Sequence, residues 1–264
     1  MKAACGGLLL AAAGTAIAGQ SCETAPMTLA EARTGLALAE AVQARLDASG
    51  SDVAVVARVG QDLSKYGLFY SHAGVVWRSA PGAPWRVVHL LNDCGTAHSD
   101  LWAQGLGNFF LNGIHAPQAA VLIPPAATAA ALKARLQDPL ALRALHQPAY
   151  SVVAYPYSLR YQNSNQWLLE TVATVQSREL RLDNREAAQS WLKLAGYQPT
   201  ELKLRTLTRL GGRVFKANVA FDDHPNELRF SDRIRTVTVE SLERFWTQPA
   251  QGWRETTVRV DEAG

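Results

Sequence analysis

The chain has 264 residues, of which 48% are hydrophobic and 19% are charged, and its formal net charge is +3. This composition supplies enough apolar side chains for a buried core and excludes an intrinsically disordered chain. The positive charge is spread along the sequence without a basic run, which argues against nucleic-acid partners and against strong binding to a membrane surface.

Residues 1–18 have the features of a secretory signal peptide. Lys2 supplies a positive start, an apolar stretch runs from Leu8 to Ala13, and residues 16–18 (AIA) form a cleavage site. The apolar stretch is too short to span a bilayer, and no later segment has eighteen uninterrupted apolar residues. We therefore expect an exported protein, periplasmic or otherwise extracytoplasmic, whose mature chain (19–264) is one α+β domain without a transmembrane segment.

The first half of the chain predicts a helix, a buried strand and a hairpin. Thr28 and Glu31 form a capping box, and apolar residues then recur at three- and four-residue steps until Gly50. The hairpin is indicated by a Pro/Gly-rich turn (SAPGAP) between two β-rich segments. The expected elements are a helix from about residue 28 to 50, a strand over 53–59, a loop or short helical turn over 61–70, and hairpin strands over 72–78 and 85–91.

Beyond the hairpin, helices and short strands follow without an internal repeat or a long linker. The expected elements are a weak helix over 99–110, strands over 119–123 and 151–155, helices over 128–137, 164–176 and 184–195, a basic stretch over 202–213, a polar loop over 221–232, a strand over 235–239, a helix over 240–246 and a last strand over 255–260. Together they predict a core over about 53–176 and a C-terminal α/β extension over about 178–264.

Two cysteines remain after the signal peptide, Cys22 and Cys94. In an oxidising compartment, two cysteines are most simply explained as one disulfide. Closing so long a loop would add roughly 4 kcal/mol to the stability. The alternative is that Cys94 is a nucleophile, since His89 and His98 lie close to it in the sequence.

The hairpin brings two histidines together if its strands pair in the expected register. With Arg78 opposite Trp85, His72 and His89 become diagonal neighbours on one face, and Gly74 leaves space between them. A shift of one residue would put the two histidines on opposite faces. Two adjacent imidazoles can act as a general base and the group that orients it, although each histidine taken alone is more often structural.

A candidate nucleophile lies downstream at the start of the helix over 164–176. Asn163 and Gln166 suit a capping box, which would place Ser164 in the first helical turn. The unpaired amides there, including that of Asn165, would favour an alkoxide and a developing oxyanion. The alternative is that Ser164 is simply the residue that caps the helix.

Three segments of the chain, SHAGVVWR, VVHLLND and QNSNQWLLE, resemble the permuted papain-like superfamily. This superfamily includes NlpC-type cell-wall peptidases and the lecithin:retinol acyltransferase-like enzymes. The resemblance implies an antiparallel sheet packed on helices, with His72 as general base, His89 as the orienting residue and Ser164 as the nucleophile. It also implies that Gly74, Asn165 and Trp167 line the site, and that the reaction is hydrolysis or acyl transfer at an amide or ester, with cell-wall peptides as the substrate class and no cofactor.

One residue departs from the papain-like pattern. Those enzymes have a cysteine where this chain has Ser164, and a serine hydroxyl is far less acidic than a thiol. The sequence therefore leaves two further readings open: an inactive papain-like module of the cell envelope that binds a peptide, glycan or protein, and a purely structural domain. Longer segments resemble an exported bacterial family of unassigned function, and they supply no activity: ARVGQDLSKYGLFYSH, VVHLLNDCGT, QGLGNFF, YQNSNQWLLE and ANVAFDDHPNELRFSDRI.

The remaining polar and aromatic residues have simpler interpretations. The other histidines are scattered without metal-binding spacing, so we expect no metal site, and the Asp222-Asp223-His224 run is typical of a capped polar turn. The basic stretch over 202–213 is interpreted as a solvated helix face. Several tryptophans suit either the core or a binding groove: Trp77, Trp85, Trp102 and Trp167. The sequence does not fix the oligomeric state.

Overall fold

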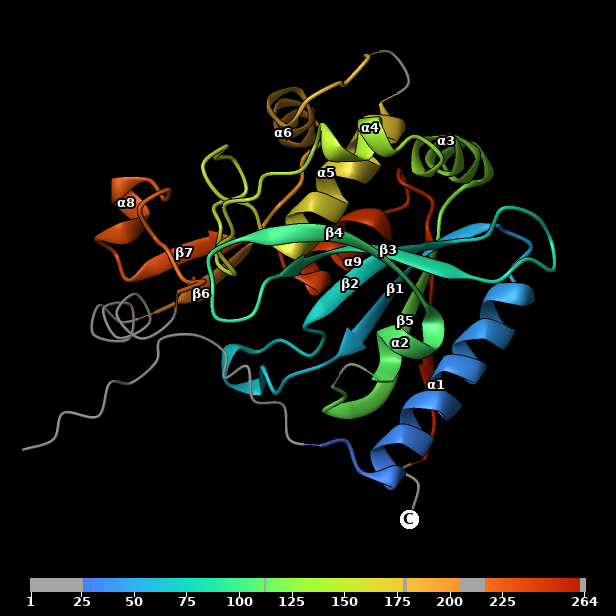
Figure 1. Ribbon diagram of the computed structural model, residues 1–264. Coiled ribbons are helices and arrows are strands. Elements are labelled where there is room, and N and C mark those ends of the chain that lie inside the picture. Colours follow the sequence, from blue (N-terminus) through green and yellow to red (C-terminus); the bar gives the residue numbers. More distant parts are fainter. Residues whose placement is uncertain (1–25, 112, 178–179, 205–216, 262–264) are drawn as a thin grey trace, which may run out of the picture.

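The computed structural model describes residues 26–111, 113–177, 180–204 and 217–261. Its centre is a six-stranded antiparallel sheet in the order β4-β3-β2-β1-β5-β8, beside a small two-stranded sheet of β6 and β7 (Figure 1). The strands are β1 (Val53–Val59), β2 (His72–Trp77), β3 (Arg86–Asn92), β4 (Ser99–Gly105), β5 (Ala116–Ile123), β6 (Thr200–Lys203), β7 (Arg233–Thr236) and β8 (Arg254–Arg259). The α+β class is therefore confirmed, with an antiparallel sheet and helices on it.

Helices cover both faces of the large sheet (Figure 1). They are α1 (Leu29–Asp47), α2 (Leu106–Leu111), α3 (Ala126–Leu136), α4 (Pro139–Arg143), α5 (Ser164–Gln176), α6 (Arg185–Leu194), α8 (Asn226–Arg229) and α9 (Val239–Trp246), with a 3₁₀ turn η1 (Ser64–Tyr66). One core lies between the sheet and α1 and α2, and we call this side the α2 face. The larger core lies between the sheet and α3, α5, α6 and α9, and we call this side the α5 face.

The alternation of residues along the strands assigns each side chain to one of these faces. In β2, Ala73 and Val75 belong to the core of the α5 face, whereas Val76 belongs to the core of the α2 face. In β3, Val88 likewise packs on the α5 face. Successive side chains of a strand point to opposite sides, so His72 and His89 lie on the α2 face.

Local sequence signals located most elements correctly. The capping box of Thr28 and Glu31 begins α1, and the buried run over Val53–Val59 is β1. The hairpin has the expected register, because Val75 lies opposite Val88 and Trp77 lies opposite Arg86. The helix cap, the buried strand and the hairpin register each depend on residues close together in the sequence. This explains why the sequence pattern was sufficient to predict them.

Two predicted elements were wrong. The segment over 99–105 is a strand and not a helix, because β4 pairs residue for residue with β3 along its whole length, and only Leu106–Leu111 is helical. The segment over 151–155 forms turns instead of a strand, since the amide of Ala154 bonds to the carbonyl of Ser151 and that of Tyr155 bonds to Asp223. In both cases long-range hydrogen bonds outweighed local propensity.

The C-terminal residues do not form a separate extension. Strand β8 pairs with β5 along six residues of the large sheet, and α9 contributes Phe245 and Trp246 to the core of the α5 face. The basic stretch over 202–213 falls mostly outside the described residues, as do the signal peptide and Cys22. Within the part of the chain that the structure describes, no helix is both long and apolar enough to cross a membrane.

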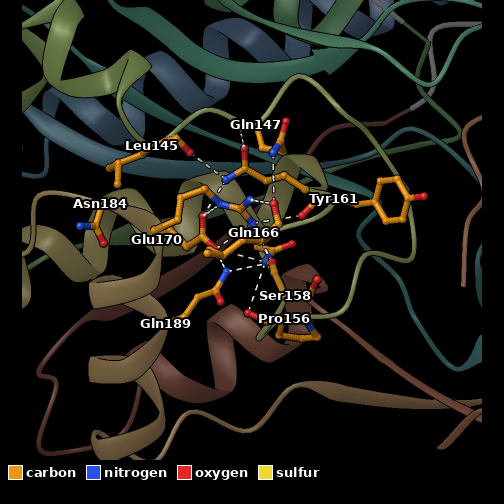
Figure 2. A network of polar contacts seen from close by, with 12 residues as sticks. Leu145, Gln147, Pro156, Ser158, Tyr161, Gln166, Glu170, Asn184 and Gln189 are labelled. Atoms are coloured by element: carbon orange, nitrogen blue, oxygen red, sulfur yellow. Dashed lines mark hydrogen bonds and ion pairs between the residues drawn. The ribbon is translucent and has the colours of Figure 1, made fainter. Parts of the chain in front are cut away.

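A buried ion pair fastens α5 to α6 and to the loop that precedes α5 (Figure 2). Glu170 has no exposed side-chain surface, and its Oε2 lies 2.7 Å from Nε of Arg185. Three amide side chains also donate to this carboxylate, those of Gln162, Gln166 and Gln189. The guanidinium of Arg185 in turn donates to the carbonyls of Ser158, Leu159 and Tyr161. A charged pair is tolerated in a core only when its remaining polar groups are satisfied in this way.

Candidate functional site

The two hairpin histidines lie together at the start of β2. His72 Nε2 and His89 Nδ1 are 2.7 Å apart, and the ring centroids are 5.0 Å apart. A Cβ on Gly74 would lie 2.6 Å from Cγ1 of Val87 and 3.0 Å from Cβ of His89, so this position accepts only glycine without a shift of the strands. The predicted neighbourhood of the two histidines, with Gly74 beside them, is therefore confirmed.

Aromatic and basic residues surround the pair on the α2 face. The Phe109 ring of α2 lies 5.8 Å from the His72 ring and 5.4 Å from the His89 ring, between centroids. Arg58 of β1 is directly opposite His72 and bonds to the carbonyl of Phe109. Arg58 and Phe109 are residues that sequence reasoning missed. Arg58 did carry a signal, because it is the one charged residue in an otherwise apolar strand (VAVVARV).

This environment keeps both imidazoles neutral. Burial, followed by the positive charge of Arg58, lowers the pKa of His89 to about 3. Burial also lowers the pKa of His72 well below its usual value, with smaller contributions from His89 and Arg58. Burial lowers the pKa of Arg58 itself to about 10, so the guanidinium stays charged at neutral pH.

The hydrogen bond between the two imidazole rings determines which nitrogen of His72 remains available to act as a base. Because the bond uses Nε2 of His72, the Nδ1 atom of that ring has no hydrogen-bond partner among the described residues. If Nε2 of His72 donates the proton, Nδ1 is a free acceptor, as a general base requires, and Nε2 of His89 carries a hydrogen. That His89 nitrogen is buried and lacks a partner among the described residues.

The lowered pKa values predict a loss of stability in mild acid. An unfolded histidine titrates near pH 6.5, so below that pH the unfolded chain gains a proton that folded His89 does not bind. Between pH 7 and pH 5 this difference lowers the free energy of unfolding by about 2 kcal/mol. We expect urea denaturation at the two pH values to show at least that loss in the wild type, because folded His72 also stays unprotonated, and a smaller one in His89→Gln. An equal pH dependence in both proteins would contradict the assignment.

Ser164 lies beside a buried tyrosine. It is the first residue of α5 and is 7% exposed, and the phenol of Tyr150 is near its side chain and backbone. The helix is capped by Asn163, whose Oδ1 accepts from the amide of Gln166, so Ser164 is not the capping residue. The Gln166 side chain bonds to Glu170 and does not complete a capping box.

The start of α5 adjoins the start of β2. The amide of Ala73 donates to Oδ1 of Asn165 at 3.2 Å, one residue away from His72. Trp167 is fully buried in the core of the α5 face. No hydrogen bond joins Ser164 to His72 within the described residues. The structure thus brings His72, His89 and Gly74 together on the α2 face, places Trp167 in the core of the α5 face, and puts Asn165 next to the backbone of Ala73.

The acidic segment over 222–224 is used internally. Asp223 bonds to Nδ1 of His224 at 2.9 Å and to the amide of Tyr155, and Nε2 of His224 lies 2.9 Å from the carbonyl of Arg235. Asp222 pairs with Arg160 at 2.9 Å. These contacts join the polar turn to the loop before α5, in agreement with the interpretation of the run as a structural turn.

The turn between β3 and β4 gathers polar groups that the sequence analysis did not combine. Asp93, His98 and Asp100 each contribute one side-chain oxygen or nitrogen atom to a cluster in which these atoms lie within 4.8 Å of one another. Nδ1 of His98 is 2.6 Å from Asp93. The sequence feature that could have predicted this cluster is the position of the three residues on the two sides of one tight turn. Cys94 is exposed in the same turn, whereas Cys22 lies outside the described residues, so the disulfide between them stays a prediction.

Comparison with known proteins gives a family without an activity. A search of curated proteins and a search of solved structures each found no significant match. The profile of one family, described as uncharacterized proteins conserved in bacteria (DUF2145), matches residues 45–246. This range holds β1 to β5, the histidine pair and the start of α5, so it covers the whole candidate site. The chain therefore belongs to the DUF2145 family of bacterial proteins.

Proposed function

We propose that this protein is a non-catalytic binding module of the bacterial cell envelope, built on a papain-like arrangement of sheet and helix. The observation that carries the proposal is that no hydrogen bond joins Ser164 to His72 within the described residues, whereas the phenol of Tyr150 lies beside Ser164. A serine nucleophile needs a base within about 3 Å of its hydroxyl and a site that a substrate can enter.

The surroundings of the two groups support a structural role for each. The Ser164 hydroxyl lies beside the buried phenol of Tyr150, and the serine is only 7% exposed. The His89 ring is completely buried and packs edge-on against Phe109. Close aromatic packing of this kind is typical of a rigid core, and a rigid core suits a module that presents a surface.

A second candidate function, an envelope hydrolase or acyltransferase, is favoured by one specific observation. The ring nitrogens of His72 and His89 pair in the way that a base and its orienting residue require, and Nδ1 of His72 is left over. In that reaction His72 would take the hydroxyl proton of Ser164 as its oxygen attacks an amide or ester carbonyl.

Labelling by a fluorophosphonate probe tests the choice between the two functions. We expect the wild type and Ser164→Ala to give the same background labelling, because no base activates the hydroxyl. Tyr150→Phe removes the phenol hydroxyl beside Ser164 and is the matched variant, and it too should stay unlabelled. Labelling of the wild type that disappears in both Ser164→Ala and His72→Ala, with unchanged melting temperatures, would overturn the binding-module proposal and support the hydrolase.

A further inference from the structure

Strand β4 is the outermost strand on one side of the large sheet (Figure 1). Among the described residues, only the start of its outer edge is covered: the amide of Ser99 donates to the carbonyl of Pro148 at 3.0 Å, and the amide of Tyr150 donates to the carbonyl of Ala97 at 2.8 Å. Since the Ser99 amide points away from β3, those of Leu101 and Ala103 do so as well. None of the described residues bonds to these outward amides or to the carbonyls beside them.

The sequence of β4 does little to protect this edge. Proteins usually block an open strand with proline, lysine or a bulge, and β4 (SDLWAQG) has neither residue. Its register with β3 is continuous over seven residue pairs, so there is no bulge in it. An unprotected edge with free backbone groups is a template for an added strand.

The side chains along the edge indicate what kind of strand would fit. Asp100 and Trp102 are two residues apart on β4 and therefore share a face, on which Trp102 is 52% exposed. Asp93 and His98 lie against Asp100, which concentrates negative charge at one end of the edge. An added strand would place one side chain beside Asp100 and, two residues along, another beside Trp102.

We propose that the β4 edge binds an extended peptide of another protein, with a basic side chain beside Asp100 and an apolar one beside Trp102. This inference deepens the proposed binding function and rests on it. The backbone groups of Leu101 and Ala103 form the hydrogen bonds to the added strand. Asp93 and Asp100 attract the basic side chain of the peptide, and Trp102 packs on the apolar one. A second copy of this chain is a poorer occupant, because it would bring its own pair of aspartates to the same edge.

The test uses the mature protein and a heptapeptide labelled with fluorescein at its N-terminus, fluorescein-Thr-Thr-Lys-Thr-Phe-Thr-Thr-amide, followed by fluorescence anisotropy. We expect saturable binding that weakens with added salt, and binding about tenfold weaker when glutamate replaces lysine. Ala103→Pro removes an outward amide without breaking the ladder to β3, and should also weaken binding about tenfold. Ala103→Thr keeps that amide and should bind like the wild type, and melting temperatures establish that both variants fold.

Two results would overturn the inference: equal binding by Ala103→Pro and the wild type, or no preference for lysine over glutamate. A dimer in sedimentation analysis that Ala103→Pro dissolves would show that the edge pairs with a second copy instead. These outcomes are separate from the failure of the proposed function. A peptide that does not bind removes only the β4 inference, whereas probe labelling at Ser164 removes the non-catalytic function whatever happens at β4.

Discussion

Replacing Arg185 with methionine is expected to lower the free energy of unfolding by about 3–5 kcal/mol. The substitution leaves the Glu170 carboxylate without its counter-charge at a site that has no exposed side-chain surface. It also frees the carbonyls of Ser158, Leu159 and Tyr161, which the guanidinium now binds. Urea denaturation monitored by circular dichroism measures the loss.

The pH dependence of this defect has a definite sign. Burial raises the pKa of Glu170, against the opposing effects of Arg185 and the glutamine amides. A carboxyl whose pKa is higher in the folded state than in the unfolded state favours folding at low pH, and this contribution is lost as the pH rises. Without Arg185 the pKa rises further, so the Arg185→Met defect should be smaller at pH 5 than at pH 8.

Arg181→Met is the matched control for this prediction. Arg181 also pairs with a carboxylate, that of Asp183 at 2.9 Å, but its side chain is 89% exposed. Water screens such a pair, and its removal should change stability by less than about 1 kcal/mol. Similar losses in the two variants would contradict the view that burial of the Glu170–Arg185 pair makes it indispensable.

Replacing Phe109 with alanine is expected to cost about 3–5 kcal/mol and to expose the histidine pair. The Phe109 ring is fully buried and touches both imidazoles, and the Arg58 guanidinium carbon lies 5.0 Å from its centroid. With the ring removed, water can reach His72 and His89, so their pKa values should rise toward the ordinary value. Denaturation measures the stability, and a histidine NMR titration follows the pKa values.

Phe230→Ala controls for the loss of an aromatic ring. Phe230 is 82% exposed, so its removal should leave both the stability and the histidine titration nearly unchanged. If Phe109→Ala destabilised the protein while the histidines titrated as before, burial by Phe109 could not be the cause of their lowered pKa values.

We place the function of the protein on surfaces that local sequence patterns do not identify. The histidine pair was recognisable because alternation along two strands and a tight turn fix which residues are neighbours. The open β4 edge was not, because its segment was expected to be a helix, and only its pairing with β3 shows that it is a strand. The exposed Trp102 became a candidate contact residue only once this segment was known to be an edge strand.

The sequence by itself determined the local geometry of this protein: the capped α1, the buried β1, the β2–β3 register and the contact between His72 and His89. Each follows from residues close together in the chain, through capping, alternation and turn chemistry. Only the tertiary structure decided where Ser164 lies relative to His72. A periodic pattern says which residues share a face, but not which face of the sheet a distant helix will cover. That choice was made by contacts between residues far apart in sequence, such as Asn165 with Ala73.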